Sequence, residues 1–105
     1  MITYRIYQVN EDHFRDVAFR DYENVKRDFG EPKKDWYDLV YEFESEDELT
    51  PDDLYRTFNL YQPYDFKGHS LSVSDVVEMV GTVESGDGYW YCDSFGWMEI
   101  DWRDQ

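Results

Sequence analysis

Hydrophobic and polar residues alternate with a period of two in two stretches of the chain, as they do in β-strands. The first stretch, residues 2–9, is rich in β-branched and aromatic side chains. In the second stretch, residues 37–44, one side consists of Tyr37, Leu39, Tyr41 and Phe43. The other side consists of Asp38, Val40, Glu42 and Glu44. The pattern therefore predicts two strands, and the second is half-buried with a mostly acidic open face.

Between these strands the spacing changes to that of a helix. Apolar residues recur every three or four positions, and they are Phe14, Ala18, Tyr22, Val25 and Phe29, with Val17 beside them. Asn10 is the expected N-cap, and Gly30 marks the end of the helix. Phe19 lies off the apolar stripe, so the pattern also allows a break near residues 19–21.

The rest of the chain predicts one more helix and further strands. Thr50 followed by Pro51 starts a short helix that ends near Asn59. Strands are expected at 76–80, 89–93 and 97–102, with turn residues at 85–88. We therefore expect a single acidic α+β domain over residues 1–105, with two helices and an antiparallel or mixed sheet of four or five strands.

The composition is that of a folded intracellular protein. Of 105 residues, 41% are hydrophobic and 20% aromatic, whereas chains disordered by charge have few aromatics. Cys92 is the single cysteine, so no disulfide can form within the chain. The start of the chain lacks the basic and apolar pattern of a signal peptide, and no apolar run approaches the roughly 20 residues that span a bilayer. A cytoplasmic location is expected.

The negative charge lies in the last two thirds of the chain. Residues 1–34 contain seven acidic and seven basic side chains. Residues 35–105 contain eighteen acidic and three basic side chains, and they carry the whole net charge of -15. Such a field repels nucleic acid and anionic membranes, and it attracts proteins with basic grooves. The expected partner is therefore a basic protein that handles nucleic acid, with no direct nucleic-acid or membrane binding.

Carboxylates near the end of the second strand are candidate substitutes for phosphates. They are Glu42, Glu44, Glu46, Asp47 and Glu48. Same-side residues of a strand lie about 6.6 Å apart, whereas duplex DNA carries a phosphate charge about every 1.7 Å, so one strand cannot imitate a duplex. A second acidic row is available from Glu78, Glu84, Asp87, Glu99 and Asp101. The alternative is a solvated face that only keeps the protein soluble.

Trp97 is the candidate apolar anchor of such an interface. In the last predicted strand it shares one side with Glu99 and Asp101, and these three residues join the acids above as candidate partner-binding residues. The other side, with Met98, Ile100 and Trp102, is the expected core. In the alternative interpretation, Trp97 packs on the edge of the sheet against the helix that carries Tyr55.

Catalytic and metal sites lack a supporting motif. His69 with Ser70 or Cys92 has no nucleophile elbow around it, and Cys92 is expected to be a buried thiol within a strand. His69 is expected to order its loop through backbone hydrogen bonds. His13 and His69 are far apart, and residues 46–53 lack the spaced ligands of a calcium loop, so neither a metal nor another cofactor is predicted.

Several segments together resemble the YodL-like domain family. They are residues 60–77, which include the run Gly68-His69-Ser70-Leu71-Ser72-Val73-Ser74-Asp75, residues 91–97, the opening residues 4–8 and the strand 37–43. The resemblance implies an origin in Gram-positive bacteria, often on conjugative elements and plasmids. It implies no catalytic residues, since the family has no agreed mechanism. Small acidic proteins of such elements are frequently anti-defence factors, including inhibitors of Cas9 or of restriction enzymes.

The sequence therefore favours a non-enzymatic inhibitor that docks an acidic surface on a Cas9-type nuclease or a restriction enzyme by nucleic-acid mimicry. A second hypothesis is an interaction or regulatory module of a conjugative element, in which acidity serves only solubility. A third is a small enzyme that uses His69 with Asp75 or Asp93. The oligomeric state is open, because an edge strand can pair with a second copy.

Overall fold

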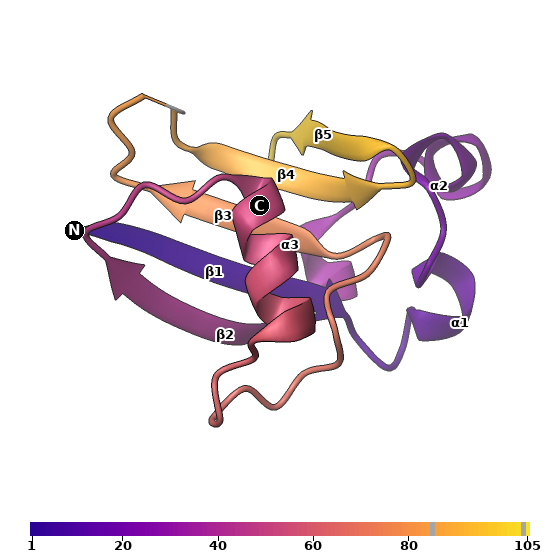
Figure 1. Cartoon of the computed structure of the whole chain (residues 1–105). Helices are drawn as coiled ribbons and strands as arrows, with labels where there is room; N and C mark the ends of the chain where they lie inside the picture. Colours follow the sequence, from indigo (N-terminus) through magenta and orange to yellow (C-terminus); the bar gives the residue numbers. More distant parts are fainter. Residues whose placement is uncertain (85, 104) are drawn as a thin grey trace.

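The computed structural model describes residues 1–84, 86–103 and 105, and Figure 1 shows its fold. The strands are β1 (Ile2–Val9), β2 (Tyr37–Ser45), β3 (Val76–Val80), β4 (Gly88–Asp93) and β5 (Gly96–Ile100). The helices are α1 (Phe14–Val17), α2 (Tyr22–Phe29) and α3 (Pro51–Leu60), with the short 3-10 helix η1 (Lys34–Trp36) before β2. The predicted α+β fold is confirmed. Ser85, placed in the predicted turn before β4, lies outside the described residues.

The strands form one sheet in the order β2-β1-β3-β4-β5, and each neighbouring pair is antiparallel. Of the two sheet types that the sequence allowed, the antiparallel one is therefore present. β1 lies beside β3 although the chain between them forms α1, α2, β2 and α3. In the register, Arg5 of β1 stands opposite Glu42 on one side and Glu78 on the other.

The first predicted helix is divided in two. Phe19 has a positive φ of 66°, a conformation that ends α1, and Asp21 then caps α2 by accepting a hydrogen bond from Asn24 N at 2.9 Å. Asn10 caps the turn before α1, because its Oδ1 accepts from His13 N at 3.1 Å. The predicted apolar stripe was wrong at its ends. Phe14, the first residue of α1, and Phe29, the last residue of α2, are exposed.

β2 contains a bulge that interrupts its alternation. Ile6 pairs with Tyr41 and Tyr7 pairs with Leu39, so Val40 is an extra residue on β2. The prediction that all four apolar side chains of this strand share one side is therefore wrong. Tyr37 packs into the core cluster on one face, Tyr41 and Phe43 pack against the cluster on the other, and Leu39 is half exposed.

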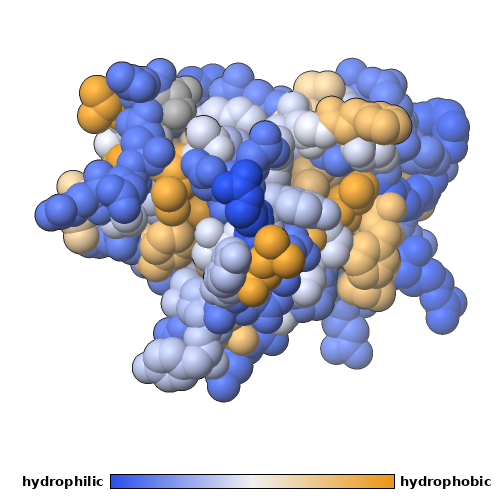
Figure 2. Space-filling view, viewed as in Figure 1, coloured by the Kyte–Doolittle hydropathy of each residue, from blue (hydrophilic) through white to orange (hydrophobic). Residues whose placement is uncertain are grey.

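Each face of the sheet has its own core. α3 covers one face, with a core of Ile2, Tyr4, Ile6, Leu54, Phe58, Phe66, Leu71, Val77 and Met79. The other core contains side chains of α1 and α2 and comprises Tyr7, Val9, Val17, Tyr22, Val25, Trp36, Tyr37, Val76, Tyr91, Ile100 and Trp102. Ile100 and Trp102 are buried as predicted, whereas Met98 is 37% exposed. On the α3 side the surface is mostly hydrophilic, with separate hydrophobic patches (Figure 2).

Candidate interaction surface

Half of the sheet face opposite α3 is left uncovered. Along β1, buried and half-exposed side chains alternate as far as Arg5, and from Ile6 to Val9 all are buried. The change shows that the second half of β1 is covered on both faces and the first half on one face only. We call the uncovered part the open sheet face. It consists of Thr3, Arg5, Glu42, Glu44 and Val80, and the buried carboxylate of Glu78 lies at its inner edge.

A row of charged and phenolic side chains crosses the inner end of the open sheet face. Arg5 Nε lies 2.5 Å from Glu42 Oε2, and Arg5 Nη1 lies 3.2 Å from Glu78 Oε1. The Tyr7 hydroxyl donates to Glu78 Oε1 at 2.9 Å, and the Tyr89 side chain also hydrogen-bonds to Glu78. Arg5 is thus shared between two carboxylates, so it contributes no free positive charge to this face.

The ionisation of these groups follows from their contacts. The hydrogen bond to Glu42 raises the pKa of Arg5, against an opposing effect of burial, and Glu78 adds to the rise. Burial, followed by the hydrogen bond to Glu78, raises the pKa of Tyr7 and raises that of Tyr89 to about 12. Both phenols are therefore neutral donors at physiological pH, and the row keeps its negative sign.

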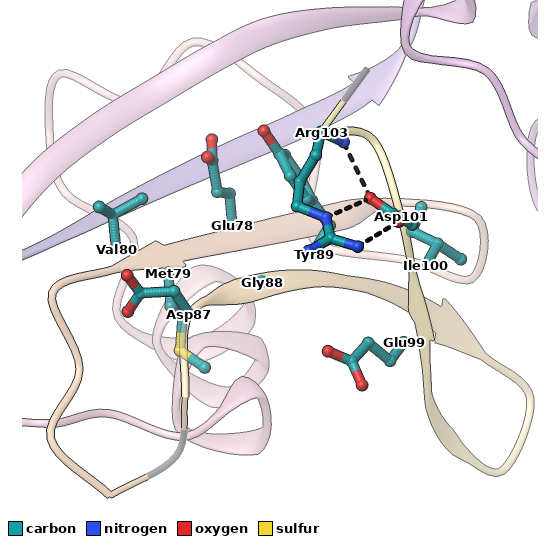
Figure 3. Close-up of a pocket in the computed structure, with 10 residues that line it drawn as sticks. All are labelled: Glu78, Met79, Val80, Asp87, Gly88, Tyr89, Glu99, Ile100, Asp101 and Arg103. Atoms are coloured by element: carbon teal, nitrogen blue, oxygen red, sulfur yellow. Dashed lines mark hydrogen bonds and ion pairs between the residues drawn. The ribbon is translucent and has the colours of Figure 1, made fainter. Parts of the chain in front are cut away.

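A hollow of about 550 Å³ continues the open sheet face toward β5 (Figure 3). Carboxylates of Glu78, Asp87, Glu99 and Asp101 line it, together with the apolar side chains of Met79, Val80 and Ile100. Gly88 also lines it, and a Cβ at Gly88 would stand 3.1 Å from Glu99 Oε2. Four of the five residues proposed for a second acidic row are thus brought together, and Glu84 is not part of the hollow.

One basic residue lies at the mouth of this hollow. Arg103 donates from Nε to Asp101 Oδ1 at 2.9 Å and from Nη2 to Asp101 Oδ2 at 2.7 Å. These hydrogen bonds lower the pKa of Asp101 to about 2, so the carboxylate is ionised throughout the physiological range. The pair is exposed, with 83% of the Arg103 side chain and 58% of the Asp101 side chain accessible.

The eight predicted partner-binding residues fall in three places. Glu42 and Glu44 lie on the open sheet face, and Asp101 lines the hollow beside it. Glu99 also lines the hollow, but from the α3 side of the sheet, because it pairs with Trp90, which packs against the core under α3. Glu46, Asp47 and Glu48 lie beyond the end of β2, in the connection to α3. Trp97 lies on the α3 side of the sheet.

The loop after β2 has structural contacts of its own. The Glu48 carboxylate accepts hydrogen bonds from Val83 N at 2.5 Å and from Glu84 N at 3.0 Å. The backbone oxygen of Asp47 accepts from the Tyr4 hydroxyl at 2.7 Å. Glu48 therefore holds the β3–β4 connection, a role that no local pattern in the sequence indicates.

Trp97 packs against the helix side of the sheet. Its ring lies against the core cluster under α3, and its Nε1 donates to Asp52 Oδ1 at 2.9 Å. This is the alternative arrangement considered from the sequence, in which Trp97 packs against the helix that carries Tyr55. Its hydrogen-bond partner on that helix is Asp52. The indole is only partly exposed and its polar atom is already bonded.

The most specific segment of the sequence, residues 68–75, forms a buried polar network with β1. Gln8 Nε2 donates to the backbone oxygen of His69 at 2.8 Å and to Asp75 Oδ2 at 3.1 Å, while Gln8 Oε1 accepts from His69 N at 3.2 Å. A Cβ on Gly68 would overlap Gln8 Oε1. The network fixes this loop against β1, and sequence reasoning missed it because the partners are 61 to 67 positions apart.

His69 and Cys92, the candidate catalytic residues, each have a structural environment of their own. His69 Nδ1 lies 2.7 Å from the backbone oxygen of Ser70, which agrees with the expected loop-ordering role. Cys92 is buried, and burial raises its pKa to about 12, so the thiol is protonated at neutral pH.

Within residues 1–84, 86–103 and 105, no group of three or more His, Cys, Asp or Glu side chains is close enough to hold a metal ion. In the same part of the chain no helix has the length and apolar character needed to cross a bilayer.

Comparison with known proteins gives one match. The model of the YodL-like domain family matches residues 3–102, which is nearly the whole chain. No curated protein and no solved structure matches it.

Proposed function

The chain belongs to the YodL-like domain family, and on that premise we propose that it is a non-enzymatic acidic inhibitor from a mobile element. It acts in the cytoplasm by binding a basic protein that handles nucleic acid. A Cas9-type nuclease is the first target and a restriction enzyme the second. The inhibitor occupies the positively charged channel that otherwise holds nucleic acid.

The observation that carries the proposal is the array of exposed carboxylates on a rigid sheet. Glu42 and Glu44 stand on β2, and Asp87 and Asp101 stand at the hollow, three to four strands away. Adjacent strands are about 4.8 Å apart, so the two groups lie about 14 to 19 Å from each other across the sheet. This supplies the second acidic row that imitation of a duplex requires.

The first test removes charge from this surface and from a matched control surface. One variant carries Glu42→Gln, Glu44→Gln, Glu46→Gln and Asp47→Asn, and it keeps Glu48, which holds the β3–β4 connection. The control carries Glu11→Gln, Asp12→Asn, Asp16→Asn and Glu23→Gln, all exposed in the neutral part of the chain. Both variants lose the same charge.

Binding to purified guide-free and guide-loaded Cas9, and to a restriction enzyme, is measured at low and high salt. The native protein and the control variant are expected to bind with an affinity that falls steeply with salt, and the first variant at least tenfold more weakly. Binding that is insensitive to salt and equal in all three proteins contradicts the proposal.

A second candidate function, an interaction module of a conjugative element with solubilising acids, is favoured by exposed aromatics. Phe95 is fully exposed between β4 and β5, and Phe19 is 56% exposed. In this case the double variant Phe19→Ser and Phe95→Ser abolishes partner binding, while removal of the four acids has no effect.

A further inference from the structure

We propose that the partner docks on the open sheet face and its hollow, and that it does so with arginine and lysine side chains of a folded basic protein. This inference rests on the proposed function and adds the face that binds. It excludes the loop 46–48 and the Trp97 side as the main contact.

The first argument is accessibility. Thr3 and Arg5 are half-exposed on β1, and Glu42 and Glu44 are exposed beside them on β2. Val80, opposite Thr3 on β3, is 38% exposed. Three paired strands thus present an uncovered and rigid face, which binds with little loss of conformational freedom.

The second argument is charge. The open sheet face and the hollow carry four exposed carboxylates, namely Glu42, Glu44, Asp87 and Asp101, beside the buried carboxylate of Glu78. Three basic groups lie close to them: Arg5 pairs with Glu42 and Glu78, Arg103 pairs with Asp101, and Lys34 Nζ lies 5.8 Å from the ring centroids of Tyr7 and Tyr89. The surface keeps an excess of negative charge, so a basic surface complements it.

The third argument is the shape of the hollow. Val80 and Ile100 are apolar and border the phenol of Tyr89, while carboxylates stand around them. A long basic side chain fits such a site, because its aliphatic part packs on the apolar residues and its charged end reaches a carboxylate. The carboxylates do not converge enough to hold a metal ion within the described residues. An extended organic cation therefore matches the hollow better than an ion does.

Two of the other candidates, Glu48 and Trp97, are already engaged in internal contacts. Glu48 holds the backbone of residues 83 and 84, and Trp97 is tied to Asp52 on α3. A partner that used these groups would have to replace internal contacts. On the open sheet face, Glu44 is exposed and stands opposite Thr3, an uncharged residue.

The experiment compares Val80→Lys with Val83→Lys. Both changes replace an exposed valine by lysine and raise the net charge equally, but Val80 lies on the open sheet face and Val83 lies in the β3–β4 connection. An oligo-arginine peptide serves as the probe, with affinity and the amide chemical shifts of the labelled native protein as readouts. We expect the peptide to shift amides of residues 3–5, 42–44, 78–80 and 88–89. We also expect Val80→Lys to bind at least about tenfold more weakly than Val83→Lys.

Equal losses of affinity in the two variants overturn the inference, as do shifts concentrated at residues 46–48 and 97 or an absence of peptide binding. The proposed function is tested separately, by the binding of Cas9 and restriction enzymes to the native protein. Peptide binding on the open sheet face without capture of a nucleic-acid enzyme supports the docking surface and counts against the proposed function. Capture of such an enzyme with equal affinity by both lysine variants supports the proposed function and counts against the docking surface.

Discussion

Asp75 shows how one buried carboxylate can set the pH dependence of the whole fold. Its Oδ2 accepts hydrogen bonds from Ser72 N at 2.9 Å and from Gln8 Nε2 at 3.1 Å, both neutral donors. Burial nevertheless dominates and raises its pKa to about 7, from an ordinary value of 3.8. The folded protein therefore retains a proton that the unfolded chain releases. The stability associated with this proton is fully present below about pH 4 and is lost as the pH rises through about 7.

Asp75→Asn is expected to abolish most of this loss, because asparagine keeps an oxygen acceptor and never ionises. The free energy of unfolding of the native protein should fall by up to about 4 kcal/mol between about pH 4 and pH 8, and that of the variant by much less. Urea unfolding across this pH range measures both. Asp38→Asn, at an exposed position of β2, is the control and should keep the native dependence. A native stability that is flat from pH 4 to 8 contradicts the assignment.

At the scale of elements, α3 is a helix whose start is determined by residues that are close together in the sequence. Thr50 Oγ1 accepts from Asp53 N at 3.1 Å, and Asp53 Oδ2 accepts from Thr50 N at 2.9 Å, which together form a capping box at the helix start that the sequence predicts. Leu54 and Phe58 then bury against the sheet. Such an element is predictable because its cap and its apolar face lie within ten residues.

Thr50→Ala is expected to lower the free energy of unfolding by about 1 kcal/mol, since Asp53 N loses its acceptor. Thr57→Ala in the same helix is the matched control, and it should leave stability unchanged or slightly higher because alanine favours helix. Thermal or urea unfolding of the two variants checks the difference. Equal effects would mean that the capping box contributes nothing in solution.

Other elements depend on contacts that a single sequence does not reveal. The break after α1 is stabilised by a hydrogen bond from Phe19 N to Ser74 Oγ at 3.0 Å, between residues 55 positions apart. Phe19 and Ser74 both have positive φ, so neither conformation follows from local preference. The bulge at Val40 likewise arises from the pairing of β2 with β1. The strand β1 and the capped helix were predictable for the opposite reason, since their patterns are local.

The same distinction applies to the candidate site. The sequence predicted the carboxylates and their sign, because charge is read directly from composition. It did not predict that Glu78, Asp87, Glu99 and Asp101 share one hollow, since the antiparallel pairing of β3, β4 and β5 brings them together. Nor did it separate Glu48, which bonds to backbone, from Glu44, which is exposed on β2.

For the whole molecule, a net charge of -15 on 105 residues predicts a stability that increases with salt. Screening of carboxylate repulsion up to about 0.5 M NaCl should add about 1 kcal/mol, or roughly 5 °C in Tm. Calorimetry at several salt concentrations measures this. A variant with Glu44→Gln, Glu46→Gln and Asp47→Asn should start from a higher Tm at low salt and gain less. A Tm that is independent of NaCl would show that repulsion between the carboxylates does not destabilise the fold.

The bulge in β2 also bears on how copies of this protein tolerate crowding. β2 is the outermost strand of its side of the sheet, and an unprotected outer strand is a template on which identical chains stack into fibrils. The extra residue at Val40 breaks the straight ladder that such stacking needs, and Asp38, Glu42 and Glu44 would bring like charges together in any copy that approached. A burst of synthesis can therefore raise the concentration of this protein without starting aggregation through the β2 edge of the sheet.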